Sequence, residues 1–534
     1  MHKAVSLFTL TAAAIAVFWW WLGMAVTMPA SPLDPGEKLY CVSYAPFRGQ
    51  QSPLDLATRI EQWQIDEDLA RLAKITDCIR IYSVDFGLEN VPEIAARHGL
   101  KVLLGLWVSG HADRTQHQID TGVALVRRFP AAIRAVIVGN EALLRGEIGS
   151  DALANLIRRV KSQVSVPVSY ADVWEFWVRH RNLAEAVDFI TVHILPYWED
   201  HPIAAIEAAE HVDAIRRKVA ETFTGREIVI GEVGWPSAGR MRSGALPSPA
   251  NQARVVQDIL ARGKRESFRV NIIEAFDQPW KRYQEGTVGG HWGLISDQPR
   301  AEKFTWGASV SNHPHWRWQA AGGVAFAGLV FAAAFAAQHR ATRAPTLTVW
   351  TAIAAAAGSG GALLGWTLAN MPIESLGFGG WLRSASFAAI AFAAPLVCAG
   401  GLASGIAAPS FAAMLGPAEA RARGRPERVL GWLLIALFVL AMESALGLAF
   451  DPRYRDFPFA PLTGAVAPFL LLSSLTPRLQ GSRPSAETSA AVVLAISVAA
   501  ILWNEGIANW QAVWTAAALA ALAIILARVR AAPG

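Results

Sequence analysis

Long apolar runs set one stretch of the chain apart from the rest. Residues 37–304 carry charges throughout, whereas the chain from Trp318 onward is mostly Ala, Leu, Gly, Phe and Val. A helix needs about 20 apolar residues to span a bilayer. Eight runs approach that length, at residues 4–26, 320–337, 346–369, 386–408, 429–450, 459–475, 489–503 and 510–527. The pattern predicts an N-terminal transmembrane anchor in 1–30, a globular domain in 37–310 and an all-α bundle of about seven spans in 318–530.

Within the globular domain, short apolar runs alternate with segments of helical periodicity such as 65–74, 122–129 and 151–164. Several runs are continuously β-branched, which is typical of strands buried on both faces. A doubly wound sheet is the alternative, but no Gly-rich phosphate loop follows the first strand. Eight such units predict an α/β fold, a (β/α)8 TIM barrel. The expected strands are 39–44, 78–83, 101–107, 135–139, 166–171, 189–194, 227–231 and 270–276.

The charge distribution predicts an orientation for the expected spans. The chain is 53% hydrophobic and 17% charged, with a net charge of +5. Its basic residues are not gathered on one folded face, which argues against nucleic acid as a partner. They fall in alternate loops between the apolar runs, so the positive-inside rule places both termini in the cytoplasm and the globular domain outside it. The cytoplasmic set is Lys3, Arg340, Arg343, Arg421, Arg423, Arg425, Arg428, Arg478, Arg483, Arg528 and Arg530.

The three cysteines predict neither a zinc site nor a disulfide. No CxxC or His–Cys cluster is present. Cys41 and Cys78 lie on neighbouring strands, but if Tyr44 and Arg80 both point into the barrel, strand alternation turns the two thiols to opposite faces. The pairs His111/His117 and His313/His315 lack carboxylates at ligand spacing. We therefore expect no metal and no cofactor.

Two carboxylates stand out among the residues at the expected strand ends, where TIM barrels carry their chemistry. Glu141 ends the fourth strand in VIVGNEALLRG, and Glu232 ends the seventh in IVIGEVGWPSAG. Strands four and seven face each other across the barrel mouth. Retaining glycosidases need two carboxyl groups about 5–5.5 Å apart, one a nucleophile and the other an acid and then a base. Arg80 is the expected cation that keeps the nucleophile ionised.

Six motifs make the domain resemble glycoside hydrolase family 17, the β-1,3-glucanase family. They are APFRGQQSP, RIYSVD, VGNE, ILPYW, GEVGWPS and EAFDQPWK. The resemblance implies that Glu141 is the acid/base, that Glu232 is the nucleophile and that Asn140 binds the 2-hydroxyl of the sugar. Val233 departs from the Thr or Ser common in the family, and His193 stands where plant members often have Asn.

Other residues near the strand ends have two interpretations each. Glu274 is either a rival acid or a supporting residue paired with Lys281, and His193 either bonds the nucleophile or caps its strand. Tyr44 and Arg80 are expected to contact substrate. The aromatic residues form either a sugar-stacking platform or packing at the rim, and they are Tyr82, Tyr197, Trp235, Phe276 and Trp280.

Three functions remain open. Bacterial members of the family that carry membrane segments are similar to transglycosylases, some of them tied to cyclic periplasmic β-glucans. The resemblance thus favours a retaining β-1,3-glucan transglycosylase of the bacterial inner membrane with a periplasmic catalytic domain. The expected partners are β-1,3-glucan, membrane lipid and a membrane glucan synthase. A membrane-anchored β-1,3-glucan hydrolase and a glucan-binding or export protein are the alternatives.

Overall fold

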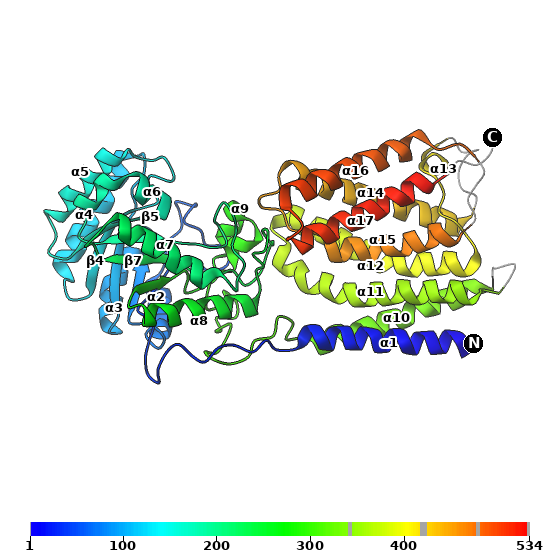
Figure 1. Cartoon of the computed structure of the whole chain (residues 1–534), viewed down its shortest axis with the longest axis horizontal. Helices are drawn as coiled ribbons and strands as arrows, with labels where there is room; N and C mark the ends of the chain where they lie inside the picture. The colour runs from blue at the N-terminus through cyan, green and yellow to red at the C-terminus, as the bar shows by residue number, and fades with distance from the viewer. Residues whose placement is uncertain (1, 340–343, 417–423, 477–480, 531–534) are drawn as a thin grey trace. The chain divides into compact units, whose positions relative to one another are not determined.

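The chain divides into two compact units in a computed structural model that describes residues 2–339, 344–416, 424–476 and 481–530 (Figure 1). One unit comprises Val26–Gly239 and Gly244–Val310. The other comprises Met1–Ala25, Arg240–Ser243 and Ser311–Gly534.

The first unit is a closed barrel of eight parallel strands in sequential order, which confirms the predicted (β/α)8 fold. Strand interiors are almost wholly buried, as the continuous apolar runs indicated. Several expected strands extend beyond the hydrogen-bonded ladder. The strands are β1 (Cys41–Ser43), β2 (Cys78–Ile81), β3 (Lys101–Leu106), β4 (Ile133–Asn140), β5 (Val168–Val173), β6 (Ile190–His193), β7 (Ile228–Val233) and β8 (Arg269–Ile272).

Amphipathic helices surround this barrel. α5 (Ser150–Lys161) buries Leu153, Ile157 and Val160 at helical spacing. α8 (Pro249–Arg265) begins with proline and is capped by Ser248, whose hydroxyl accepts a hydrogen bond from the Asn251 N–H at 3.1 Å. The other elements of the unit are α2 (Gln62–Leu72), η1 (Leu88–Asn90), α3 (Val91–Arg97), α4 (Ala112–Arg128), α6 (Trp174–Arg179), η2 (Arg181–Glu185), α7 (Ala208–Thr222), η3 (Pro279–Lys281), α9 (Arg282–Glu285) and η4 (Thr287–Gly290).

A disulfide joins Cys41 and Cys78, so the expectation of two unpaired thiols is wrong. Val42 pairs with Ile79 and Ser43 with Arg80, which places the two cysteines opposite each other with Cα atoms 4.4 Å apart. The alternation rule itself holds, but Tyr44 points away from the barrel interior, and its hydroxyl donates to Asp68 Oδ2 at 3.1 Å. Both sulfurs therefore face inward, in a buried cluster with Leu103, Ala135, Ile137 and Ala171.

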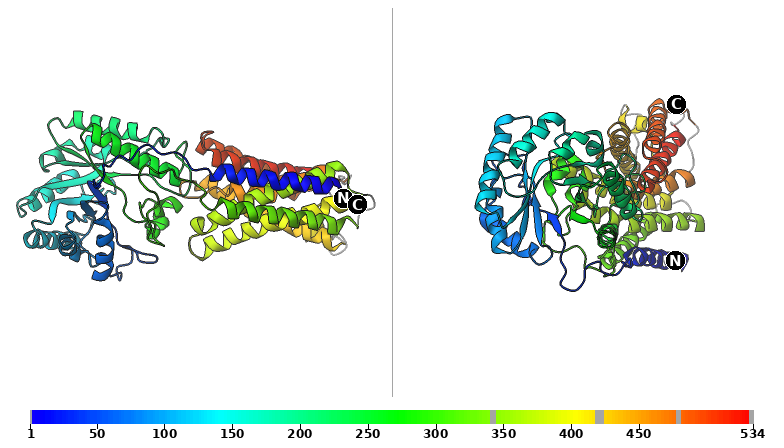
Figure 2. Two further views of the ribbon diagram at one scale, coloured as in Figure 1. Left: turned by 90° about the horizontal axis from the view of Figure 1, so that it is seen from below. Right: turned by 60° about the vertical axis from the view of Figure 1, so that its left-hand side comes forward.

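The second unit is a bundle of long apolar helices that lie side by side (Figure 2). By length and composition, seven helices of the described chain can span a membrane, and α15 (Phe459–Leu475) is apolar but shorter. Each of the eight expected spans overlaps one of these helices. The seven are α1 (His2–Gly23), α10 (Trp316–Gln338), α11 (Leu347–Glu374), α12 (Gly377–Ser404), α14 (Arg425–Phe450), α16 (Ser485–Glu505) and α17 (Trp510–Arg528); α13 (Phe411–Leu415) is a short turn.

Small residues bring the helices of this bundle close together. A Cβ added to Gly323 on α10 would lie 2.4 Å from the Gly361 carbonyl oxygen on α11, so the two backbones touch at glycine, as is common between membrane helices. Glu443 on α14 accepts a hydrogen bond from Arg455 Nη1 at 2.8 Å. Of the loop charges that predicted the orientation, Arg340, Arg343, Arg421, Arg423 and Arg478 lie outside the described residues.

Candidate active site

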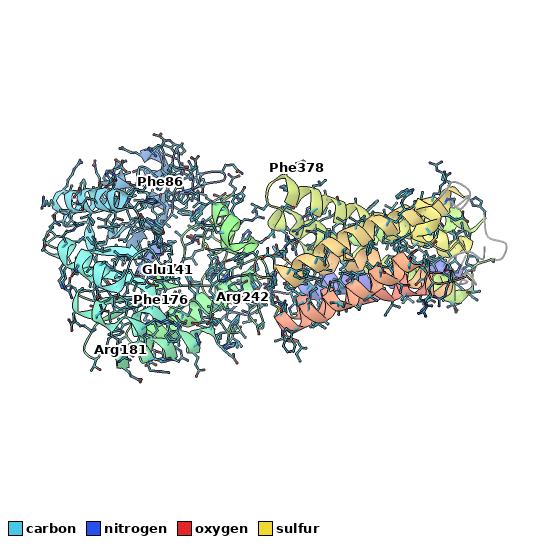
Figure 3. The ribbon with its side chains drawn as sticks, turned by 90° about the horizontal axis from the view of Figure 1, so that it is seen from above. Phe86, Glu141, Phe176, Arg181, Arg242 and Phe378 are labelled. Atoms are coloured by element: carbon cyan, nitrogen blue, oxygen red, sulfur yellow. A yellow bond between two sulfur atoms is a disulfide. The ribbon has the colours of Figure 1, made fainter. Side chains whose placement is uncertain are left out.

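Glu141 and Glu232 come together at the carboxyl ends of their strands. Glu141 directly follows β4 and Glu232 lies within β7. One oxygen of each carboxylate and one ring nitrogen of His193, at the end of β6, all lie within 4.8 Å of one another. Figure 3 shows Glu141 in the middle of the barrel unit. The spacing is close to the ~5–5.5 Å of the carboxyl pair in retaining glycosidases.

The backbone after β4 turns sharply to present Glu141. Gly139 has φ +89° and Glu141 has φ +52°, a left-handed conformation that side-chain-bearing residues rarely adopt. Hydrogen bonds on both sides hold the turn: the Glu141 N–H donates to the Ala171 carbonyl at 2.8 Å, and the Arg145 N–H donates to the Glu141 carbonyl at 2.9 Å. Strain of this kind concentrates at functional sites, where it fixes the direction of a side chain.

Arg80 and His193 connect the two carboxylates. Arg80 Nη1 donates to the Gly231 carbonyl at 2.8 Å and lies 3.4 Å from Glu232 Oε1. It also lies 3.1 Å from His193 Nε2, while His193 Nδ1 lies 2.7 Å from Glu141 Oε1. A guanidinium can only donate, so Nε2 is the acceptor of this contact. The hydrogen of a neutral His193 is then on Nδ1 and is donated to Glu141, not to Glu232.

Two further contacts complete this arrangement. Arg80 Nη2 donates to Asn140 Oδ1 at 2.6 Å, which orients the Asn140 amide beside the carboxylates. Gly231 leaves the space that Arg80 and His193 occupy, because a Cβ there would lie 2.3 Å from Thr191 Cγ2 and 3.2 Å from Arg80 Nη1. Asn140, Arg80 and His193 are therefore grouped with the carboxylate pair, as the sequence suggested.

The environment of Glu141 favours its ionised form. Burial opposes ionisation, but the hydrogen bond from His193 and the positive charges of Arg80 and Arg145 outweigh it and lower the pKa of the Glu141 carboxyl. The Glu141 side chain is thus held mainly as the carboxylate near neutral pH.

Replacing His193 with Ala is expected to shift the pH dependence of kcat/KM. Removal of the hydrogen bond from Nδ1 raises the pKa of Glu141, so the carboxyl keeps its proton to higher pH. The alkaline limb of the profile then shifts to higher pH. That limb reports the essential acid of the free enzyme. His193→Gln, which retains an N–H donor, should move the limb less; an unchanged limb in His193→Ala would assign it to another group.

Glu274 at the barrel end is the rival acid. Lys281 Nζ donates to its Oε1 at 2.7 Å, which is the pairing expected from the sequence. Burial raises the pKa of Glu274 to about 7 despite that lysine. Its side chain is only 1% exposed, whereas that of Glu141 is 22% exposed. A general acid must first lie within hydrogen-bond distance of the substrate, and only then does its pKa matter. The more exposed position of Glu141 therefore favours it as the acid, although Glu274 is the more readily protonated.

Four of the aromatic residues expected to contact substrate are buried. Tyr44, Tyr197, Trp235 and Phe276 are each 1% exposed or less. Trp235 Nε1 donates to the Leu246 carbonyl at 3.1 Å, and Tyr197 packs edge to face against Trp235 and Trp292. A ring with no free face cannot stack on a sugar, so Tyr197, Trp235 and Phe276 follow the second interpretation and pack the rim. The expectation that Tyr44 contacts substrate is corrected, because its side chain is buried against α2.

The remaining aromatic candidates keep partly exposed surface. Trp280 is half-buried, and its Nε1 donates to Gln278 Oε1 at 2.9 Å. Tyr82 is also half-buried; its hydroxyl donates to Ser43 Oγ at 2.8 Å and its ring lies 4.7 Å from Arg80 Cζ. Their role in sugar stacking stays a prediction.

Sequence reasoning missed Arg145 and gave Trp107 no role. Arg145 Cζ lies 4.0 Å from the centre of the Trp107 ring, Arg145 Nη2 donates to the Val108 carbonyl at 2.7 Å, and Trp107 is 37% exposed. This places an aromatic ring with a cation on one face next to the Glu141 turn. The signal was present in the sequence, since Arg145 follows Glu141 by one helical turn in NEALLRG.

The group Glu141, His193 and Glu232 offers three atoms with the spacing of a metal site in the described part of the chain. Its hydrogen bonds argue against that use. In the arrangement derived above, Nδ1 of His193 carries a hydrogen and Nε2 accepts from Arg80, so neither nitrogen has a free lone pair for a cation. The guanidinium of Arg80 already supplies positive charge beside Glu232.

Comparison with known proteins gives a family match for most of the barrel unit. Residues 41–293 match the family model of the BtgE/BtgC glycoside hydrolase domain. The chain is similar to a glucan 1,3-beta-glucosidase of Candida albicans, with 27% identity over 249 residues, which are 42% of this chain and 81% of the relative. A probable glucan endo-1,3-beta-glucosidase (btgC) of Aspergillus fumigatus is 26% identical over 287 residues, 48% of this chain and 41% of that protein.

Solved structures resemble about half of the chain. One is a glycoside hydrolase family 17 beta-1,3-glucanosyltransferase from Rhizomucor miehei, with 23% identity and a TM-score of 0.45 over 50% of this chain and 97% of that one. Another is an endo-laminarinase from Formosa, with 19% identity and a TM-score of 0.43 over 48% of this chain and 83% of that one.

Proposed function

Because residues 41–293 form a glycoside hydrolase family 17 domain of the BtgE/BtgC type, we propose that this chain is a retaining β-1,3-glucan transglycosylase anchored in a membrane. The observation that carries the proposal is the approach of Glu141 and Glu232 to within 4.8 Å. The curated relatives above, named as 1,3-β-glucosidases, support β-1,3-glucan as the substrate class.

In the proposed mechanism, Glu232 attacks the anomeric carbon and forms a glycosyl ester while the glycosidic bond breaks. Arg80, 3.4 Å from Glu232 Oε1, stabilises the carboxylate before attack. Glu141 protonates the departing oxygen and then, as a carboxylate, removes the proton from the incoming hydroxyl. The hydrogen bond from His193 favours that second role, because it stabilises the ionised form of Glu141.

The identity of the acceptor distinguishes transfer from hydrolysis. Bulk water is about 55 M, whereas well-oriented intramolecular reactions reach effective molarities of ~10⁵–10⁸ M, so even a modestly organised acceptor site lets sugar outcompete water. Trp107, Trp198 and Trp280 keep partly exposed surface and are the aromatic walls we assign to such a site. A degradative enzyme also gains little from the long apolar helices of the second unit. The hydrolase is the second candidate, since the carboxylate pair suits both outcomes.

The product spectrum tests the transferase. Incubated with a β-1,3-gluco-oligosaccharide at millimolar concentration, the protein should yield products longer than the donor, or a closed ring. Trp280→Ala should shift products toward hydrolysis more than it slows donor cleavage. If the wild type released only shorter reducing sugars across a wide range of acceptor concentrations, the hydrolase would stand instead.

We also propose that the chain lies in a bacterial inner membrane with the barrel in the periplasm and both termini in the cytoplasm. The Arg-rich loops support this orientation. The Cys41–Cys78 disulfide supports an oxidising compartment for the barrel. Figure 1 shows the first residues of α1 and the last residues of α17 at the same end of the helical unit, which suits an even number of spans and requires α15 to cross the membrane as well. Membrane lipid and a membrane glucan synthase are proposed partners.

A reporter that is active only in the periplasm tests this topology. Fused after Phe304, it should be active, because the barrel is outside; fused after Pro345, it should be silent, because α10 has returned the chain to the cytoplasm. Fluorescence or growth on selective medium measures the outcome. The reverse pattern would refute the orientation.

A further inference from the structure

Helix α2 lies on the outside of the barrel unit (Figure 1), and one of its faces carries an exposed stripe of side chains. Trp63, Glu67 and Arg71 follow one another at four-residue spacing, so they share a face over about 12 Å of helix. Trp63 is 63% exposed, and the side chains of Glu67 and Arg71 are 45% and 37% exposed. Arg48 Cζ lies 5.7 Å from the centre of the Trp63 ring.

The stripe borders a hollow of about 340 Å³ between α2 and the segment that follows β8. Polar side chains alone line it, namely Arg48, Glu67, Arg71, Asp297, Gln298 and Arg300. Arg48 belongs to both the hollow and the Trp63 contact, so the ring and the hollow adjoin.

Arg300 lines this hollow, and its buried guanidinium has unused hydrogen-bond donors. Its side chain is 8% exposed, and none of its three guanidinium nitrogens has a hydrogen-bond partner. The group is held by charge and shape, 3.2 Å from Asp68 Oδ1 and 4.0 Å from the centre of the Phe276 ring. Asp297 contributes an unused acceptor, since Oδ1 is buried without a partner while Oδ2 accepts from the Gly49 N–H at 3.2 Å. Buried polar groups are normally satisfied, so a polar ligand fits this hollow.

The charges around the hollow indicate which kind of polar ligand it can hold. Three arginines (Arg48, Arg71 and Arg300) are matched by three carboxylates (Glu67, Asp68 and Asp297) in and directly behind the lining. An anion would meet Glu67 and Asp297, and a cation would meet the guanidiniums. A neutral polyol accepts hydrogen bonds from the arginines and donates to the carboxylates, and one face of a pyranose offers C–H groups to the Trp63 ring.

From these observations we infer that the α2 face and its hollow form a second carbohydrate-binding site, which holds a neutral glucan segment away from the carboxylate pair. The inference rests on the proposed function for its ligand class. Such a site retains a long chain beside the enzyme while one end is processed, because the second contact raises the effective concentration of the first.

Substrate length separates this site from the catalytic cleft. The full chain, in detergent or lipid nanodiscs, is measured for co-sedimentation with insoluble β-1,3-glucan and for KM on polymeric β-1,3-glucan and on a β-1,3-linked trisaccharide. Trp63→Ala and Gln298→Ala should each weaken polymer retention and raise the polymer KM, with Trp63→Ala losing about threefold to tenfold, the usual size of one aromatic contact. KM and kcat for the trisaccharide should not change. Ile206→Ala, at an apolar residue that is 69% exposed on the same unit, is the matched control and should behave as the wild type.

The outcomes are distinguishable. Unaltered polymer retention and polymer KM in both Trp63→Ala and Gln298→Ala, with normal turnover of the trisaccharide, would overturn the second site and leave the proposed function standing. Displacement of the polymer by millimolar inorganic phosphate, with the trisaccharide rate unaffected, would also overturn it, because it would show an anion site. A wild type that neither converts the trisaccharide nor retains the polymer would remove the proposed function and this inference together.

Discussion

Replacing Glu232 with Gln is expected to lower kcat/KM by at least about 10⁴-fold, the scale on which enzymes respond to loss of a covalent nucleophile. An amide cannot form the glycosyl ester, so neither transfer nor hydrolysis proceeds. The substitution keeps the size and polarity of a side chain that is only 7% exposed, so the fold should remain. Product release from a β-1,3-oligosaccharide measures the loss, and thermal unfolding of the variant checks the fold.

A matched Glu→Gln change away from the site controls for the loss of one negative charge. Glu227, just before β7, has a 52% exposed side chain and pairs with Arg269 at 2.8 Å on the surface. Glu227→Gln should retain wild-type kinetics. Substantial turnover by Glu232→Gln would show that another carboxylate is the nucleophile.

Replacing Glu141 with Gln is expected to produce a loss that depends on the leaving group. With a sugar leaving group, which needs protonation, kcat/KM should fall by about 10²–10⁴-fold, the usual contribution of general acid catalysis. With an activated aryl leaving group, the glycosyl ester should still form, and it should accumulate because Glu141 is also the base of the second step. Burst kinetics with an aryl β-glycoside of a β-1,3-linked gluco-oligosaccharide measure the accumulation of the ester.

Glu274→Gln is the decisive comparison. Burial raises the pKa of Glu274 to about 7, so at neutral pH Glu274 holds a proton more often than Glu141 does. Since Lys281 pairs with Glu274, this variant should lose activity to a similar degree with both classes of leaving group. A leaving-group dependence in Glu274→Gln and none in Glu141→Gln would reverse the assignment of the acid.

The barrel and its carboxylate pair could be predicted from the sequence because both depend on local patterns. Buried parallel strands produce continuous apolar runs, and the C-terminal end of each run locates a strand end whatever the rest of the chain does. That reasoning placed Glu141 and Glu232 on strands that face each other, and the structure brings them together. It also named Arg80 and His193, although their hydrogen bonds to each other depend on the space left by Gly231, which no local pattern reveals.

The direction of a side chain that follows the last hydrogen-bonded residue of a strand could not be predicted in the same way. Tyr44 follows β1 immediately, yet its hydroxyl reaches Asp68 on α2, outside the barrel wall. Tyr197 and Trp235 follow β6 and β7 closely, but they pack against each other and Trp292 in the rim. Aromatic residues at strand ends serve packing and ligand contact equally well, and only the tertiary arrangement distinguishes the two.

The position of the Cys41–Cys78 bond constrains when it can be made and broken. Both sulfurs belong to side chains with no exposed surface, enclosed by the interior of the barrel. Exchange requires a thiolate to reach a sulfur atom directly, and a closed barrel offers no such approach. The folded enzyme should therefore tolerate mild reductants, and the bond must be formed while the first two strands are still open to an oxidant. A chain that crosses the membrane unfolded and folds on the far side meets that condition, whereas a barrel that closes first in a reducing compartment would keep two unreacted thiols inside it.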